Sequence, residues 1–394
     1  MSQPSFPTPN LPTNAEVVAR ATALAPALAS RADECERRRS VPESTIADYI
    51  DAGLHKIMQP QRYGGWGMGW DTLCETAVEF GKGDGSQAWV LTVYGDHAHM
   101  LGTFEAEAQD EVWADDPTTL ASTCFAPLGR MRAEKGGYVV SGKWSFSSGI
   151  DHAKWILAGA MLHRGEAPPK YTFFLAPKAE AKVIDDWHVT GLAGTGSKSF
   201  VYDELFVPPH RILDGDDHNN GTGPGTRVNP ELTYRFPRRG AFIALASVPV
   251  GVGYTMLEDF VALATDSTRR GKRAEQSYAT ALRIAETRAD LDAARLSAVA
   301  AARETMEMLA RGETPGFERR TLNSLKSAYA AMVSARAADR LFAAAGGKAN
   351  FLSSRLQRSL LDIHAANAHV AVAWDMAAAK YGRLRLGEDV SRDA

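Results

Sequence analysis

The chain has 394 residues, of which 45% are hydrophobic and 23% are charged, and its formal net charge is −3. This length and composition are typical of a globular protein of two or three domains. The charge balance, together with the absence of a long basic run, excludes the electrostatic footprint of a nucleic-acid-binding protein.

Cysteine spacing and hydropathy indicate the cellular compartment in which the protein is expected. The cysteines Cys35, Cys74 and Cys124 are far apart and form no CxxC pair, so the sequence predicts neither disulfides nor a metal site. No segment reaches ~18 uninterrupted apolar residues, and the N-terminus lacks the apolar run of a signal peptide. We therefore expect a cytoplasmic protein without a membrane span.

Helical periodicity dominates the first part of the chain, up to about residue 112, after a proline-rich lead. Asn14 is expected to cap the first helix, and Ser86 to cap a later helix with the sequence SQAWVLTVYGDHAHMLGTF. We assign these helices to an N-terminal helical domain, residues 1–115.

Short β-rich runs replace the helical pattern from about residue 119 to residue 213. They predict an antiparallel β domain, residues 116–227, with a hairpin that turns at Ser141 and Gly142. Its last segment, DGDDHNNGTGPGTR at residues 214–227, is predicted to be a loop because it offers nothing apolar to bury.

The remaining chain, residues 228–394, returns to helical spacing and predicts a C-terminal helical bundle, so the fold class is α+β. A break at GETPG, residues 312–316, separates two of its helices. The last helix is expected to run without interruption to Tyr381. Asp362 and His369, seven residues apart, then share one of its faces.

The glycine-rich segment GLAGTGSKS, residues 191–199, has the glycine spacing of a P-loop, but its lysine comes one position late. A strand, not a phosphate-binding helix, is predicted to follow it. The sequence also has no GxGxxG between a predicted strand and a predicted helix. Nucleoside triphosphate and nicotinamide sites are therefore not expected, and if the protein is a redox enzyme, its electrons must come from a source other than a bound nicotinamide.

Three stretches carry a resemblance to a known family: GKWSFSSGIDHAKW (142–155), HVTGLAGTGSKSFVYDELFVPPHR (188–211) and FAAAGGKANFLSSRLQRSLLDIHAANAH (342–369). Together they resemble the acyl-CoA dehydrogenase superfamily. Within it they look most like the oxygenase components of two-component flavin-dependent aromatic monooxygenases, the group of p-hydroxyphenylacetate hydroxylase and the secosteroid-phenol hydroxylases. The resemblance implies an N-terminal helical domain, a β domain and a C-terminal four-helix bundle, with flavin between the last two, in a homotetramer.

For the flavin ring, the resemblance implies contacts with residues 146–148. In such proteins a hydroxyl at the position of Ser148 bonds flavin N5, and the segment with Phe146 and Ser147 packs beside the isoalloxazine. A hydrogen bond at N5 in a dry pocket would slow the loss of peroxide from a flavin C4a-hydroperoxide. The alternative is that Ser147 and Ser148 only satisfy a turn.

His369 falls at or next to the position at which dehydrogenases of this superfamily carry a catalytic glutamate. No glutamate occurs between residues 359 and 386, so a base for α-proton abstraction is missing. An imidazole there could instead protonate or hydrogen-bond the peroxide. Alternatively, a histidine among alanines is a satisfied core residue.

For the substrate, the resemblance implies a pocket beside Trp89 and His97, with His97 helping to remove a phenolic proton. Their spacing of eight leaves them about 80° apart on a continuous helix, near enough to face one cavity. Arg235 resembles another position near the flavin. The alternative for the pair is a core tryptophan and a surface histidine.

For the tail of the flavin, the resemblance implies hydroxyls of the glycine-rich segment, a basic residue at the head of a bundle helix, and a glycine pair. The basic residue and the glycine pair commonly come from a neighbouring subunit, and arginine suits phosphate because it binds bidentately. Alternatively, TRRGKR is only a solvated helix start. The candidates are Thr195, Ser197, Arg269, Arg270, Gly346 and Gly347.

These expectations combine into an oxygenase that takes reduced FMN or FAD from a separate NAD(P)H-dependent flavin reductase. It would react with dioxygen through the C4a-hydroperoxide and hydroxylate a small aromatic substrate, with phenols favoured. The alternatives are an FAD-dependent acyl-CoA dehydrogenase and an N-oxygenating, S-oxygenating or indole-oxidising relative of the same fold. A helical assembly without flavin chemistry is a further alternative.

Overall fold

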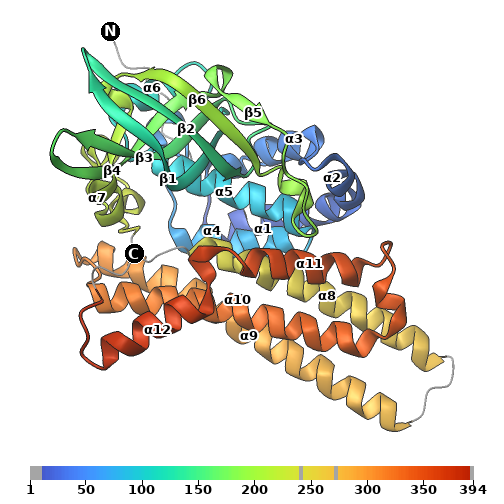
Figure 1. The fold of residues 1–394 in the computed structure, drawn as a ribbon. Helices are drawn as coiled ribbons and strands as arrows, with labels where there is room; N and C mark the ends of the chain where they lie inside the picture. Colours follow the sequence, from blue (N-terminus) through green and yellow to red (C-terminus); the bar gives the residue numbers. More distant parts are fainter. Residues whose placement is uncertain (1–10, 239–242, 270–273, 391–394) are drawn as a thin grey trace.

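The computed structural model describes residues 11–238, 243–269 and 274–390, which fold as helices, a sheet and a second group of helices (Figure 1). This order is the predicted α+β architecture and is confirmed. The helices of the first group are α1 (Asn14–Ser30), α2 (Ala32–Arg38), α3 (Glu43–Asp51), α4 (Trp70–Gly81), α5 (Gly85–Leu101) and α6 (Ala106–Trp113).

Two helix caps lie just before the predicted ones. Thr13, not Asn14, caps α1, where its side chain and that of Glu16 form a reciprocal capping box. Asp84 caps α5 by accepting a hydrogen bond from the backbone N–H of Gln87 at 2.8 Å. The hydroxyl of Ser86, the predicted cap of this helix, accepts from the N–H of Gly194 instead, at 3.1 Å.

The sheet has seven strands in the order β5-β6-β2-β1-β3-β4-β7. Every neighbouring pair is antiparallel except β1 and β3, so the prediction of a purely antiparallel sheet is wrong at that pair. The strand β3 pairs with β1 because β6 already occupies the other edge of β2. The strands are β1 (Ala121–Glu134), β2 (Gly137–Ser147), β3 (Trp155–Arg164), β4 (Ala167–Pro177), β5 (Lys182–Ile184), β6 (Lys198–Val207) and β7 (Ile212–Asp214).

The hairpin turn between β1 and β2 is not at the predicted Ser141 and Gly142, which lie inside β2. The chain turns at Gly136, whose φ of 85° is a left-handed conformation that glycine adopts without strain. A Cβ on Gly142 would lie 2.9 Å from the Cα of Gly129, so that glycine permits close strand packing. The predicted loop after the sheet is also partly wrong, because Asp214 caps a short helix, α7 (Gly215–Asn220).

The second group of helices is a bundle in which α8 to α11 pack on one another, while α12 packs against α10 (Figure 1). The predicted break at GETPG is confirmed, since it lies between α9 and α10. The helices are α8 (Ile243–Arg269), α9 (Ala274–Ala310), α10 (Phe317–Ala345), α11 (Arg355–Asn367) and α12 (Trp374–Arg385).

The prediction of one uninterrupted last helix is wrong, because the chain leaves the helix at Ala368. His369 has an extended backbone, and its Nδ1 accepts a hydrogen bond from the N–H of Ala371 at 3.2 Å. This local side-chain bond replaces the helical one and starts a short 3-10 turn, Val370–Val372. His369 therefore does not share a helical face with Asp362.

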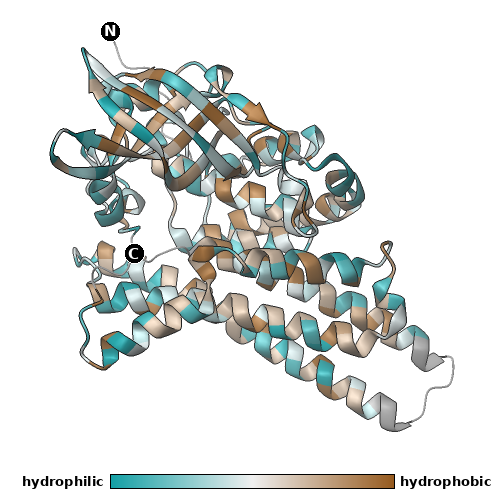
Figure 2. Ribbon diagram, viewed as in Figure 1, coloured by the Kyte–Doolittle hydropathy of each residue, from teal (hydrophilic) through white to brown (hydrophobic). Residues whose placement is uncertain are grey.

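The helix α5 lies between the sheet and the bundle, and nearly all of its residues are buried. The largest apolar core joins α5 to the N-terminal helices and the bundle, and a smaller one joins its last turn to the sheet. Apolar residues accordingly gather where α4, α5 and the bundle meet (Figure 2). Within the part of the chain that is described, no helix combines the length and apolar character needed to cross a membrane.

Candidate active site

The end of β2 turns two serines into the protein. Its register with β6 shifts between Trp144 and Ser147, and Phe146 in this bulge has a φ of 65°. Phe146 therefore points outward and is 71% exposed, whereas Ser147 is fully buried. The hydroxyl of Ser122 on β1 bonds that of Ser147 and donates to the carbonyl of Ser148 at 3.1 Å, which fixes the segment in the interior.

A chain of hydroxyl groups begins at Ser148. Its Oγ lies 2.8 Å from that of Ser197, which lies 2.7 Å from Oγ1 of Thr195. Thr195 donates to the carbonyl of Leu192 at 2.8 Å, so Ser197 must donate to Thr195, and Ser148 to Ser197. Since Nε1 of Trp89 donates to Ser148 at 3.2 Å, one lone pair of the Ser148 hydroxyl is left to accept a further proton donor.

The glycines of the predicted GLAGTG segment serve close packing. A Cβ on Gly191 would lie 2.2 Å from the carbonyl oxygen of Leu361 on α11, and one on Gly194 would lie 2.2 Å from Sγ of Cys35 on α2. The segment is thus held against two helices and continues into β6, the strand that the sequence predicts. This contact explains the glycines without a phosphate ligand.

His369 approaches the start of the hydroxyl chain from the bundle. Its ring centroid lies 5.5 Å from that of Trp89, which also bonds Ser148. Burial lowers the pKa of His369, so its ring is neutral near pH 7. Because Nδ1 accepts from the N–H of Ala371, the proton of the neutral ring is on Nε2. The structure therefore presents His369 as an N–H donor.

His97 has the opposite tautomer. Its Nδ1 lies 2.7 Å from the carbonyl of Ala121, which can only accept, so Nδ1 carries the proton and Nε2 carries the lone pair. Burial lowers the pKa of His97 to about 4, although Asp96 opposes this effect. His97 lies eight residues, or about 12 Å along α5, from Trp89. Ala121 and Ser122 are adjacent on β1, so this strand fixes both His97 and Ser148.

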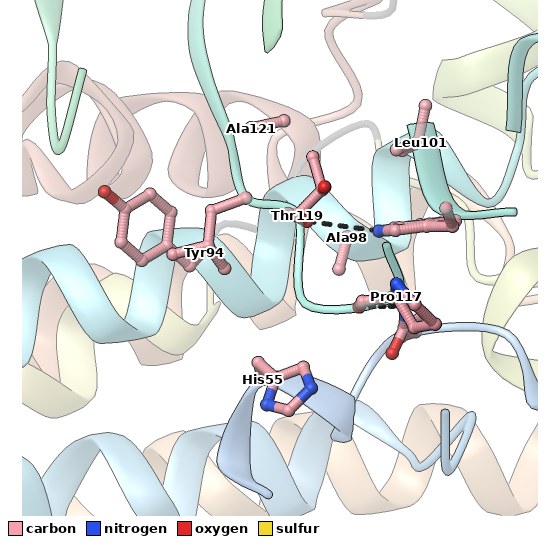
Figure 3. Close-up of a pocket in the computed structure, with 10 residues that line it drawn as sticks. His55, Tyr94, Ala98, Leu101, Pro117, Thr119 and Ala121 are labelled. Atoms are coloured by element: carbon pink, nitrogen blue, oxygen red, sulfur yellow. Dashed lines mark hydrogen bonds between the residues drawn. The ribbon is translucent and has the colours of Figure 1, made fainter. Parts of the chain in front are cut away.

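A small cavity lies between α5, which contributes Ala98, and the segment that contains His55 (Figure 3). Tyr94 and Ala121 line it, and its volume is about 10 Å³, near the ~10–15 Å³ that one water molecule needs. Pockets for organic ligands measure roughly 300–1,000 Å³. This cavity is therefore a packing space and not the place of an aromatic substrate.

Arg235 lies away from the residues described above. Its guanidinium is exposed and donates to the carbonyls of Pro230 and Thr226 at 3.0 and 3.2 Å. The buried arginine near His97 is Arg238, which is 4% exposed and forms an ion pair with Asp96 at 2.9 Å. The sequence signal for it is an aspartate within an apolar helix, since a buried carboxylate requires a cationic partner.

Of the residues predicted for the flavin tail, Thr195 and Ser197 belong to the hydroxyl chain of Ser148, whereas Arg269 and the glycine pair do not. Arg269 is the last residue of α8 and not at the head of a helix, and Arg270 lies outside the described residues. Gly346 and Gly347 are exposed at the end of α10. The helix α11, which has 13 residues and a length of about 20 Å, separates them from His369 (Figure 1).

The buried histidines predict how stability depends on pH. Burial lowers the pKa of His55, His97 and His99 to about 4. Their unfolded pKa is about 6.5, so acid protonates the unfolded chain first and favours unfolding. We expect the melting temperature to fall steeply as the pH drops from about 6.5 to about 4, measured by differential scanning calorimetry. A melting temperature that stays constant over this range would contradict buried neutral histidines.

The comparisons with known proteins agree with this geometry. The family model described as acyl-CoA dehydrogenase, N-terminal domain, matches residues 16–116, and the model of the C-terminal domain matches residues 243–374. The oxygenase subunit HsaA of a flavin-dependent monooxygenase from Mycobacterium tuberculosis is 32% identical over 381 residues, which cover 94% of this chain and 95% of the relative.

Two further proteins are similar over almost their full length. The oxygenase component of FADH(2)-dependent resorcinol hydroxylase from a Rhizobium species is 33% identical over 94% of each chain. The crystal structure of 3-HSA hydroxylase from Rhodococcus sp. RHA1 superimposes with a TM-score of 0.91 and 30% identity, covering 95% of this chain and 98% of that chain. The chain therefore belongs to the acyl-CoA dehydrogenase superfamily and, within it, to the oxygenase components of flavin-dependent monooxygenases.

Proposed function

We propose that this protein uses dioxygen and reduced FMN or FAD to hydroxylate a small aromatic substrate, with a phenol as the favoured class. One observation carries the proposal: Trp89 bonds the hydroxyl of Ser148 and lies against the ring of His369, so groups from α5, the sheet and the bundle meet at one place. Resorcinol, a phenol, is named as the substrate of one relative.

The donor and acceptor pattern of the hydroxyl chain fits a reduced flavin. The N5 position of a reduced flavin carries a proton, and the lone pair left on Ser148 can accept it. Ser148 is 9% exposed and Trp89 is 6% exposed, so this acceptor lies in a nearly dry environment where a hydrogen bond is strong. When bound, the reduced flavin supplies the electrons with which dioxygen is activated.

In this proposal His97 accepts a proton and His369 donates a hydrogen bond. Nε2 of His97 can accept the proton of a substrate hydroxyl, which makes the aromatic ring more electron-rich. The Nε2–H of His369 can donate a hydrogen bond to an oxygen atom on which negative charge develops. In this proposal the buried Arg238, rather than Arg235, is the arginine near the substrate, because it pairs with Asp96 next to His97.

We further propose that the protein is a homotetramer in the cytoplasm and that a separate NAD(P)H-dependent reductase delivers the reduced flavin. Arg269 at the end of α8, and Gly346 and Gly347 after α10, would then hold the phosphate end of a neighbouring subunit's flavin. Large apolar side chains exposed towards that end of the bundle support an assembly. They are Tyr278 (70% exposed), Leu282 (47%), Phe351 (65%) and Leu352 (89%). The domain boundaries near residues 115 and 227 stay predictions.

The test supplies chemically reduced FMN to the purified protein without any reductase. The protein is mixed under anaerobic conditions with the flavin and a panel of phenols and indoles, and then with buffer containing heavy-isotope dioxygen. A phenol that gains one labelled oxygen atom supports the proposal. Labelling of an indole alone, or consumption of flavin without any labelled product, would reject the phenolic assignment.

A further inference from the structure

The hydroxyl chain ends at a strained peptide. Leu192 has a φ of 53°, a left-handed conformation that is sterically unfavourable for a residue with a side chain. Its carbonyl accepts from Oγ1 of Thr195 at 2.8 Å and from Nε1 of Trp187 at 3.2 Å. Its N–H donates to Oδ1 of Asp362 on α11 at 2.6 Å. Contacts on both sides of this residue hold its unfavourable conformation.

Asp362 touches a third element as well. A Cβ on Gly85 would lie 2.7 Å from Oδ2 of Asp362, so the carboxyl group packs directly against the first residue of α5. That helix carries Trp89 and His97. Asp362 thus connects α11, the segment that contains Thr195 and Ser197, and the start of α5.

We infer that Asp362 is a positioning residue that fastens the Leu192 peptide to α11 and to α5, and thereby fixes the hydroxyl chain that ends at Ser148. This inference rests on the proposed function, since it explains how the flavin-contacting hydroxyl is held. Asp362 is 5% exposed, and the hydrogen bonds that lead from it to Ser148 pass through three other residues. Its effect must therefore pass through Leu192, Thr195 and Ser197.

The surroundings of Asp362 decide which substitutions are informative. Burial and the nearby carboxyl group of Asp84 raise the pKa of Asp362, with a smaller contribution in the same direction from Glu36 on α2, whereas Arg358 lowers it. Asp362 and Asp84 line a surface groove of about 310 Å³ between α1, α4, α8 and α11, through which protons can exchange. A neutral carboxyl group still accepts a hydrogen bond, so asparagine is a close mimic of the protonated side chain.

The test compares Asp362→Leu with Asp362→Asn, and uses Asp339→Leu as the matched control. Asp339 on α10 is exposed and pairs with His364, which lies on α11 like Asp362. The N–H of Leu192 bonds Asp362 and not Asp339. In flavin-free protein, hydrogen exchange of residues 191–197 should accelerate about 10-fold or more in Asp362→Leu, the factor expected when a buried donor loses its partner. Asp362→Asn and Asp339→Leu should exchange like the wild type.

The second measurement is anaerobic binding of reduced FMN, followed by fluorescence. Asp362→Leu should weaken binding about 10-fold or more, and Asp362→Asn should restore it. Gly85→Ala displaces the carboxyl group without removing it and should reproduce the leucine variant, which covers the case that Asp362→Leu fails to fold. Wild-type exchange and wild-type affinity in Gly85→Ala, or failure of asparagine to rescue, would overturn the inference.

The two measurements separate the inference from the proposed function. The exchange comparison requires no flavin, so it decides whether Asp362 anchors the segment even if wild-type protein does not bind reduced FMN. Absence of binding in the wild type would reject the proposed function. Normal binding in all variants, with accelerated exchange in Asp362→Leu, would show an anchor that does not act on the site and would also overturn the inference.

Discussion

Replacing Ser148 with alanine is expected to lower the amount of hydroxylated product per reduced flavin about 10-fold to 100-fold, the effect of losing a buried hydrogen bond worth roughly 1–3 kcal/mol. The substitution removes the hydroxyl that we propose accepts the flavin N5 proton. It also leaves Nε1 of Trp89 and the hydroxyl chain at Ser197 without their partner at this position. Electrons from the flavin should then appear as hydrogen peroxide.

The measurement is the ratio of product to peroxide after protein, reduced FMN and a phenol are mixed with oxygenated buffer. Ser145→Ala is the matched control, because Ser145 lies on β2, the strand that ends just before Ser148, and its hydroxyl bonds that of Ser199 instead. A product ratio in Ser148→Ala that equals the control would remove Ser148 from the reaction.

The second large effect is expected for His97→Asn, which should slow hydroxylation about 100-fold or more, within the range for losing a general base. The amide of asparagine can still donate to the carbonyl of Ala121, as Nδ1 of His97 does at 2.7 Å. The variant therefore retains the structural bond and loses only the acceptor at Nε2. Binding of reduced FMN, measured anaerobically, should remain close to that of the wild type.

The control is His210→Gln, which changes a histidine that pairs with Glu111 near the surface. The rate is measured with a phenol and with the corresponding phenol already ionised by an electron-withdrawing substituent. The ionised substrate should lose less rate in His97→Asn, since it needs no base. Equal losses for both substrates would show that His97 has another role.

The periodic parts of the fold could be predicted from sequence because their signals are local. Trp89 and His97 share one helix, and the β-rich segments separate two helical groups, as the spacing of apolar residues indicates. The pairing of β3 with β1 could not be predicted in this way. It depends on which edge of the sheet β6 occupies, and β6 comes later in the chain than both strands of the pair.

In the candidate site, too, some features could be predicted from the sequence and others could not. The resemblance directed attention to Ser148 and His369, but the break before His369 follows from a bond between its own side chain and the N–H of Ala371, which helical spacing cannot show. The roles of Arg238 and Asp362 depend on contacts across more than 100 residues of sequence, with Asp96 and Leu192 respectively. Neither residue stands in a pattern that local periodicity detects.

The direction of the hydroxyl chain has a consequence for proton escape. From Trp89 each donor points towards Leu192, and the last acceptor is a peptide carbonyl, which does not take up a proton in water near neutral pH. The hydroxyls are aligned to pass a proton from Ser148 towards Leu192, but such a transfer requires a base at the end, and the Leu192 carbonyl is not one. The hydroxyl chain therefore offers no exit for a proton, and in the proposed reaction it would favour retention of the N5 proton on a bound reduced flavin.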